Sequence, residues 1–193
     1  MAKTRDIDIR TKLHKDFCVK YGSDEDTLIV DELNLCQGDA RIDVAVINGI
    51  MHGYEIKSES DTLERLPGQI SIYNQVLDKV TVIVGLNHYD KVVNLVPDWW
   101  GIKVVAHNKK GFEIKTRKRN KKNKDVNPYS VAQLLWRDET LEVLAKFGLD
   151  KGYKSKPKSD LWERLAANLP IDQLKFEVRE KLKSRSGWRV GTL

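Results

Sequence analysis

The stretch from Arg41 to Lys57, R-I-D-V-A-V-I-N-G-I-M-H-G-Y-E-I-K, most constrains the fold, because two strand patterns carry charged groups that a buried sheet normally excludes. Apolar residues dominate both arms of the stretch, and Asn48-Gly49 between them is a turn signal. The segment therefore predicts a β-hairpin with Asp43 on one arm and with Glu55 and Lys57 on the other. Charged groups in such a setting indicate a functional site.

The length of the turn decides whether these side chains meet. Glu55 and Lys57 are two residues apart, so on a strand they project from one face. A two-residue turn would pair Asp43 with Tyr54 and put Glu55 on the opposite face of the sheet. We therefore predict an odd-length loop, such as Asn48 to Ile50, or a bulge, because either sets Asp43 across from Glu55.

The residue types at this hairpin suit metal-assisted hydrolysis of phosphodiester bonds. Asp43 and Glu55 are two carboxylates that could hold Mg²⁺ and leave positions for water and a phosphate oxygen. Lys57 would orient or deprotonate that water, or stabilise the anion. Glu32 lies in a β-rich segment, 27–36, and is either an exposed edge residue or a third carboxylate of the site. The spacing D-x11-E-x-K alone is a weak signal.

The remaining patterns alternate between helix and strand, which is typical of an α/β protein. Pro67 and Gly68 are expected to interrupt a short helix that Ser60 or Asp61 could cap, and the next helix carries Gln69 and Tyr73 on one face. Helices are predicted over 6–21, 69–79, 88–96, 127–147, 159–169 and 171–184, and further strands over 80–86, 102–106 and from residue 112. We divide the chain into a core, 1–124, and a helical basic C-terminal region, 125–193, packed on that core.

Charge is unevenly distributed along the chain. Residues 1–102 hold 11 Lys/Arg against 17 Asp/Glu, whereas residues 103–124 hold 10 against 1. The densest part, 115–124, is expected to be a loop or strand extension that contacts nucleic-acid phosphates without reading bases. The alternative is a solubilising basic loop. The cations predicted to bind nucleic acid are Lys115, Arg117, Lys118, Arg119, Lys121, Lys122 and Lys124.

Several other classes fit poorly. Two cysteines do not support a disulfide framework, a Cys-rich zinc site or an iron-sulfur cluster, and the four histidines show no zinc-binding spacing. No apolar run approaches the roughly 18 residues that a membrane-spanning helix needs, and no signal-peptide pattern begins the chain. The expected compartment is the cytoplasm, with no membrane partner.

The order of motifs resembles the PD-(D/E)XK nuclease superfamily. Glu32, then R-I-D at 41–43 and Y-E-I-K at 54–57, precede a helix with Q-x-x-x-Y at 69–73, which is similar to the RecB-like branch. The motifs near 61–73, 97–101 and 134–137 look like a little-characterised bacterial and phage group within that superfamily. The Pro that often precedes the first Asp is absent. The resemblance implies a restriction-endonuclease-like core, with a four-stranded mixed sheet flanked by helices.

The same resemblance implies roles for particular residues. Asp43, Glu55 and Lys57 would be catalytic with Glu32, and Asp43, Glu55, Ile56 and Glu32 would contact Mg²⁺ or Mn²⁺. Gln69 and Tyr73 would support the site or face DNA. The expected activity is Mg²⁺-dependent DNA cleavage in repair, recombination, phage DNA processing or defence. RNA as the substrate, a homodimer, and a catalytically silent nucleic-acid-binding module remain open.

Overall fold

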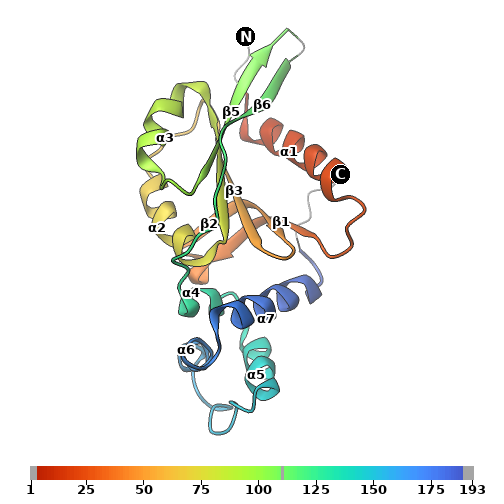
Figure 1. The fold of residues 1–193 in the computed structure, drawn as a ribbon, viewed down its shortest axis with the longest axis vertical. Helices are drawn as coiled ribbons and strands as arrows, with labels where there is room; N and C mark the ends of the chain where they lie inside the picture. Colours follow the sequence, from red (N-terminus) through yellow and green to blue (C-terminus); the bar gives the residue numbers. More distant parts are fainter. Residues whose placement is uncertain (1–3, 110, 189–193) are drawn as a thin grey trace.

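The computed structural model describes residues 4–109 and 111–188 and contains one six-stranded sheet with helices on both faces (Figure 1). In chain order the elements are α1 (Asp6–Tyr21), β1 (Leu28–Leu35), β2 (Ala40–Ile47), β3 (Met51–Lys57), α2 (Leu66–Val76), β4 (Lys79–Gly85), α3 (Tyr89–Leu95), β5 (Gly101–Asn108), β6 (Gly111–Lys118), α4 (Pro128–Ala132), α5 (Arg137–Lys146), α6 (Lys158–Asn168) and α7 (Ile171–Ser184).

The sheet is mixed and its strands follow one another in sequence order. Strands β1, β2 and β3 pair antiparallel, β3, β4 and β5 pair parallel, and β6 returns antiparallel to β5. The α/β class with helices flanking a mixed sheet is confirmed. The prediction of four strands is wrong, because β5 and β6 extend the same sheet by two strands.

The hairpin predicted at the outset has the odd-length loop. Ile47 pairs with Met51, so three residues, Asn48 to Ile50, form the connection. The Asn48 backbone N–H donates to the Ile50 carbonyl at 3.0 Å, and the Ile50 N–H donates to the Asn48 side chain at 3.3 Å. These two bonds close the loop at this length, and the resulting register places Asp43 across from Glu55.

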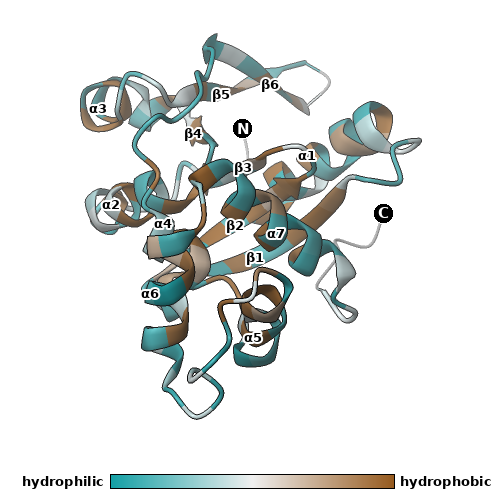
Figure 2. Ribbon diagram, turned by 60° about the horizontal axis from the view of Figure 1, so that its bottom comes forward, coloured by the Kyte–Doolittle hydropathy of each residue, from teal (hydrophilic) through white to brown (hydrophobic). Residues whose placement is uncertain are grey.

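Two apolar layers sandwich the sheet. On one face α1 packs Ile9, Leu13 and Phe17 against strand residues that include Tyr54 and Ile83. On the other face α2 and α3 lie over the strands, and their buried residues form one cluster that also includes those of α4–α7. Figure 2 shows the hydrophobic colour on the strands and the inner helix sides, with hydrophilic residues facing outward on α6 and α7.

Two helix predictions need correction. No separate short helix precedes Pro67 and Gly68, since residues 58–65 are not helical. Both residues lie in the first turn of α2, where the N–H that proline lacks would have had no partner within the helix. The single helix expected over 127–147 is two helices, α4 and α5. Asn127 caps the first by accepting the Ser130 N–H at 3.1 Å, as its Asn-Pro start predicts.

Within the described residues, none of the helices combines the length and the hydropathy that crossing a bilayer requires.

Candidate active site

In β1 and β2, the face of the sheet toward which alternate side chains point changes at the same level of both strands. Val30 and Leu33 contact the same apolar layer although they are three residues apart, and so do Ile42 and Ala45 on the neighbouring strand. An odd separation would place residues of a regular strand on opposite faces. The register puts Glu32 opposite Asp43 at this break, because Asp31 pairs with Val44 and Leu33 pairs with Ile42.

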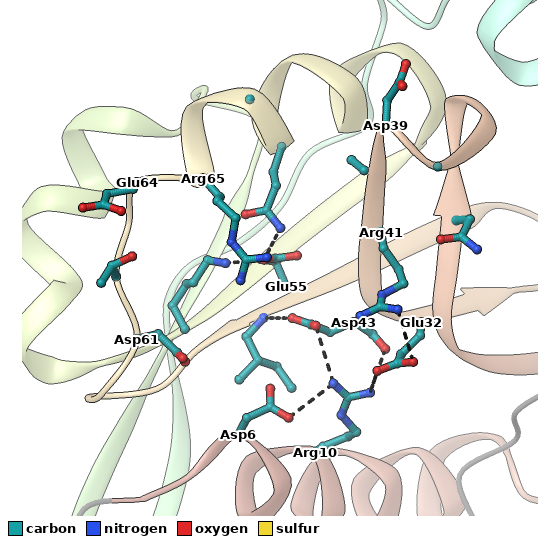
Figure 3. A pocket seen from close by; sticks show the side chains of 18 residues that line it. Asp6, Arg10, Glu32, Asp39, Arg41, Asp43, Glu55, Asp61, Glu64 and Arg65 are labelled. Carbon is teal, nitrogen blue, oxygen red and sulfur yellow. Dashed lines mark hydrogen bonds and ion pairs between the residues drawn. The ribbon is translucent and has the colours of Figure 1, made fainter.

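The backbone of Glu32 causes the break in β1. Its φ is +57°, in the left-handed region that a residue with a Cβ adopts at a cost of order 1–3 kcal/mol. Strained backbone of this kind is concentrated at functional sites. Glu32, Asp43 and Glu55 consequently lie in one row across β1, β2 and β3, and all three line a pocket of about 740 Å³ (Figure 3).

Asp43 occupies the gap where β2 and β3 separate. The last backbone pair between these strands is Val44 with Tyr54, and beyond it the Ile56 N–H donates to Asp43 Oδ2 at 2.7 Å. The carboxylate therefore takes the place of a backbone acceptor and is held at the pocket. Burial, and then the negative charge of Glu55, raise the pKa of Asp43 to about 7.

Glu55 is buried and is held by three side chains. Its Oε1 accepts hydrogen bonds from Lys57 Nζ and Gln69 Nε2, both at 2.7 Å, and its Oε2 accepts one from the Tyr73 hydroxyl at 2.6 Å. Burial and the Glu55 charge raise the pKa of Tyr73 well above its ordinary value, so the hydroxyl stays a donor. The structure thus brings together Asp43, Glu55, Lys57, Gln69 and Tyr73.

Arginines surround the remaining carboxylate. Glu32 Oε1 lies 4.0 Å from Arg10 Nη1, and its Oε2 lies 3.7 Å from Arg41 Nη1. Arg10 reaches from α1 and also places Nη2 3.5 Å from Asp43 Oδ1 and 3.2 Å from Asp6 Oδ1 (Figure 3). Among the residues that the structure describes, no three His, Cys, Asp or Glu side chains converge closely enough to hold a metal ion by themselves.

The sequence did not point to Arg10 and Asp6, because α1 reads as a helix that only supplies core residues. The available signal was their i, i+4 spacing beside the stripe of Ile9 and Leu13. How a helix lies over a sheet does not follow from its own pattern. Further pocket residues that the sequence did not indicate are Asn34, Asp39, Arg41, Asp61, Glu64 and Arg65.

The basic tract lies away from these carboxylates. Residues 115–118 belong to β6, and 119–124 continue as a loop fixed by asparagines. Asn123 is buried and donates to the carbonyls of Asn74 and Leu77, while Asn120 donates to Thr81 Oγ1 at 2.9 Å. The predicted cations are exposed, except Lys118, which is half-buried and contacts the Pro97 carbonyl. The first four residues of this basic tract thus extend β6, and the other six form a loop that asparagine side chains hold.

Comparisons with known proteins connect the chain to one group. The family model described as "Bacteriophage P4 protein cII" matches residues 5–189. A curated relative, "Protein cII" of Enterobacteria phage P4, is 25% identical over 166 residues, which are 86% of this chain and 62% of the relative. The chain therefore spans less than two thirds of that relative.

A solved structure, "SPO1766 protein of unknown function" from Silicibacter pomeroyi, is similar over 68% of this chain and 86% of its own length, with 16% identity and a TM-score of 0.39.

Proposed function

This chain belongs to the bacteriophage P4 protein cII family, and we propose that it is a Mg²⁺- or Mn²⁺-dependent nuclease that hydrolyses phosphodiester bonds of DNA on a PD-(D/E)XK-type core. The observation that carries the proposal is the pair of carboxylates, Asp43 and Glu55, set across from each other at a pocket with Lys57 bonded to one of them. Strands β1–β4, with α1 and α2 on opposite faces, would be the restriction-endonuclease-like core.

The donor set suits a divalent cation. The negative charge of Glu55 disfavours ionisation of Asp43, and a cation between the two carboxylates would offset that repulsion. Mg²⁺ is commonly bound by one or two carboxylates and keeps several waters, so a third protein carboxylate is not needed. Gln69 Oε1 is buried beside Glu55 and has no donor among the described residues, and a hydrated ion carries waters that donate hydrogen bonds. When bound, the ion supplies Lewis-acid stabilisation of charge developing on the phosphate.

The chain's own residues have separate roles in this proposal. Lys57 is held at the pocket by Glu55, where its ammonium can orient a water or neutralise charge on a phosphate oxygen. Gln69 and Tyr73 are positioning residues, because they bind the Glu55 carboxylate and fix its orientation. Asp43 is oriented by the Ile56 N–H. Ile56 thus contributes through its backbone, and the Ile56 side chain packs under α1.

A cleavage assay tests the proposal. Wild-type protein should degrade DNA with Mg²⁺ or Mn²⁺, and Asp43→Asn or Lys57→Ala should each lower the rate by at least about 100-fold. Mg²⁺ should also raise the melting temperature of wild type but not of Asp43→Asn, because an ion that binds only the folded site stabilises it. Asp39→Asn, a change at the pocket rim, is the matched control and should retain both properties.

The proposal is wrong if wild-type protein leaves linear, circular, branched and single-stranded DNA intact with both ions.

A catalytically silent nucleic-acid-binding module is the competing function. Arg10 contacts Asp43 and Glu32, and Arg41 contacts Glu32, so guanidinium groups partly neutralise the carboxylates. That arrangement favours a site that works without an ion. A protein that binds DNA but shows no Mg²⁺-dependent change in melting temperature and no cleavage has this function, whereas cleavage of RNA alone identifies a ribonuclease.

A further inference from the structure

A second polar surface lies at the opposite end of α1 from the pocket. Near the pocket α1 covers the sheet with apolar side chains, but at the beginning of β3, β4 and β5 the same face carries His52, Thr81 and Lys103. Lys79 pairs in register with His52, and Lys20 lies in the last turn of α1. We call Lys20, Lys79 and Lys103 the lysine surface.

The three lysines are close enough to act on the same histidine. Burial and the charges of Lys79, Lys20 and Lys103 lower the pKa of His52 to about 3, so the imidazole is neutral at physiological pH. Its ring nitrogens bond the hydroxyls of Thr81 at 2.9 Å and Tyr54 at 3.1 Å. A neutral, hydrogen-bonded His52 therefore lies near the three lysines.

These cations have no carboxylate partner in the part of the chain that the structure describes. None of the three makes an ion pair within 4.0 Å there. Asp16 is the carboxylate that acts on Lys103, and it already pairs with Lys12. Like charges gathered in this way repel one another, and a bound polyanion would relieve that repulsion.

The lysine surface is continuous with the basic tract. Asn120 Nδ2 donates to Thr81 Oγ1 at 2.9 Å and lies 3.1 Å from His52 Nε2, which can accept from it. The exposed cations Arg119 and Lys121 flank Asn120 in the chain, so the basic tract reaches the edge of the lysine surface at this contact. Phosphates along a nucleic-acid backbone match such an extended row of cations, whereas a single small anion would meet only part of it.

We propose that the lysine surface binds the phosphate backbone of the nucleic acid whose cleavage is assigned to the pocket. The inference rests on the proposed function only in taking the pocket as the place of cleavage. Helix α1 joins the two places, with Arg10 at the pocket and Lys20 at the lysine surface. Ten residues of helix span about 15 Å, or roughly four base pairs of B-form DNA. The surface would hold the duplex on one side of the bond to be cut.

Binding without cleavage tests this inference. Affinity for a fluorescent DNA duplex is measured against salt concentration in EDTA, with the Asp43→Asn protein, so that neither metal nor cleavage affects the result. Each phosphate contact contributes about −0.9 to the slope of log affinity against log salt. Replacing Lys20, Lys79 and Lys103 with Gln should flatten the slope by about 2.7.

The matched control replaces Lys151, Lys156 and Lys158, which are exposed near α6, with Gln and should leave the slope unchanged. Lys20→Glu is a second variant, at an exposed position in the last turn of α1, and should weaken binding by itself.

An unchanged slope in both lysine variants, or an equal loss in the control, overturns the inference. Competition by polyglutamate as effective as that by DNA at equal charge also overturns it and indicates an acidic protein partner. Loss of binding in the lysine variants, together with a wild-type protein that cleaves nothing, supports the surface and rejects only the proposed function.

Discussion

Two residues of neighbouring strands give folding stability opposite dependences on pH. The pKa of Asp43 is raised to about 7 by burial and by Glu55, so its ionisation costs stability. The pKa of His52 is lowered to about 3 by burial and nearby lysines, so its protonation costs stability. Between these limits the two groups oppose each other, and the wild-type profile alone hides both contributions.

Single substitutions should separate the two contributions. The Asp43 carboxyl holds its proton more tightly in the folded state, so its contribution is present below about pH 4 and is lost as the pH rises through 7. Asp43→Asn should therefore gain stability over wild type across that interval, by at most about 4 kcal/mol. Urea unfolding at several pH values in EDTA measures the difference.

His52→Gln serves as the opposite control. The contribution of neutral His52 is present above about pH 6.5 and is lost as the pH falls toward 3, so the variant should lose less stability in acid than wild type. Profiles of Asp43→Asn and wild type that run parallel from pH 4 to pH 8 would contradict the assignment for Asp43.

The site residues that the sequence predicted are charged side chains within otherwise apolar strands. Asp43, Glu55 and Lys57 interrupt apolar strands, and the sequence alone shows this interruption. Arg10 does not conflict with anything, because an arginine on a helix is ordinary. Its contact with Asp43 depends on where α1 crosses the sheet, which the packing of both partners decides.

Strand β1 shows how one residue can redirect an element. Glu32 has φ +57° in the middle of the strand, and the face that the strand presents changes at that residue. No local pattern predicts this conformation, since glutamate is not a residue that favours it. The alternation in 27–36 is broken in the sequence, and a broken alternation was the one available signal.

A pair of substitutions isolates the cost of that conformation. Glu32→Gly and Glu32→Ala remove the same carboxylate and its contacts with Arg10 and Arg41. Only alanine keeps a Cβ, which clashes at positive φ. We expect Glu32→Gly to be more stable than Glu32→Ala by about 1 kcal/mol in chemical unfolding. Equal stabilities, or a more stable alanine variant, would show that the strand relaxes to ordinary backbone once the glutamate is removed.

Element boundaries were predicted well where periodicity and caps agree. Residues 6–21 and 171–184 form the expected helices, because each has an apolar stripe and a clear start. The strand count was wrong for a different reason. The patterns over 102–106 and from residue 112 indicate strands, whereas the family resemblance implies a sheet of only four strands.

The C-terminal helices are joined to the sheet by a buried ion pair. Lys175 Nζ on α7 lies 2.7 Å from Asp78 Oδ1, which precedes β4, and both side chains are buried. Asp78 also accepts the Met51 N–H at 2.8 Å and, through its carbonyl, the Asn123 N–H. The pair thus connects α7, the hairpin and the end of the basic tract. A link between residues 97 apart in sequence could not be predicted from pattern or charge.

Removing one member of this pair should strongly destabilise the whole chain. Lys175→Met leaves the Asp78 carboxylate buried without its cation, which costs on the order of 3–5 kcal/mol. Lys181→Met, on the same helix but in a more exposed pair with Glu142, is the control and should cost less than about 1 kcal/mol. Chemical unfolding measures both.

The double variant Asp78→Asn, Lys175→Met should recover part of the loss, since no uncompensated charge remains. A Lys175→Met protein as stable as the control would mean that water reaches Asp78.

The number of residues in the loop from Asn48 to Ile50 sets the register of the hairpin that carries the candidate site. The loop length thus sets which residue of β3 stands across from the Asp43 carboxylate. Replacing a loop residue leaves that parity intact, whereas deleting one would exchange the two faces of β3 against β2. A chain so shortened would present Tyr54 where Glu55 now lies. A register shift of one residue in this hairpin would therefore separate the Asp43 and Glu55 carboxylates and place them on opposite faces of the sheet.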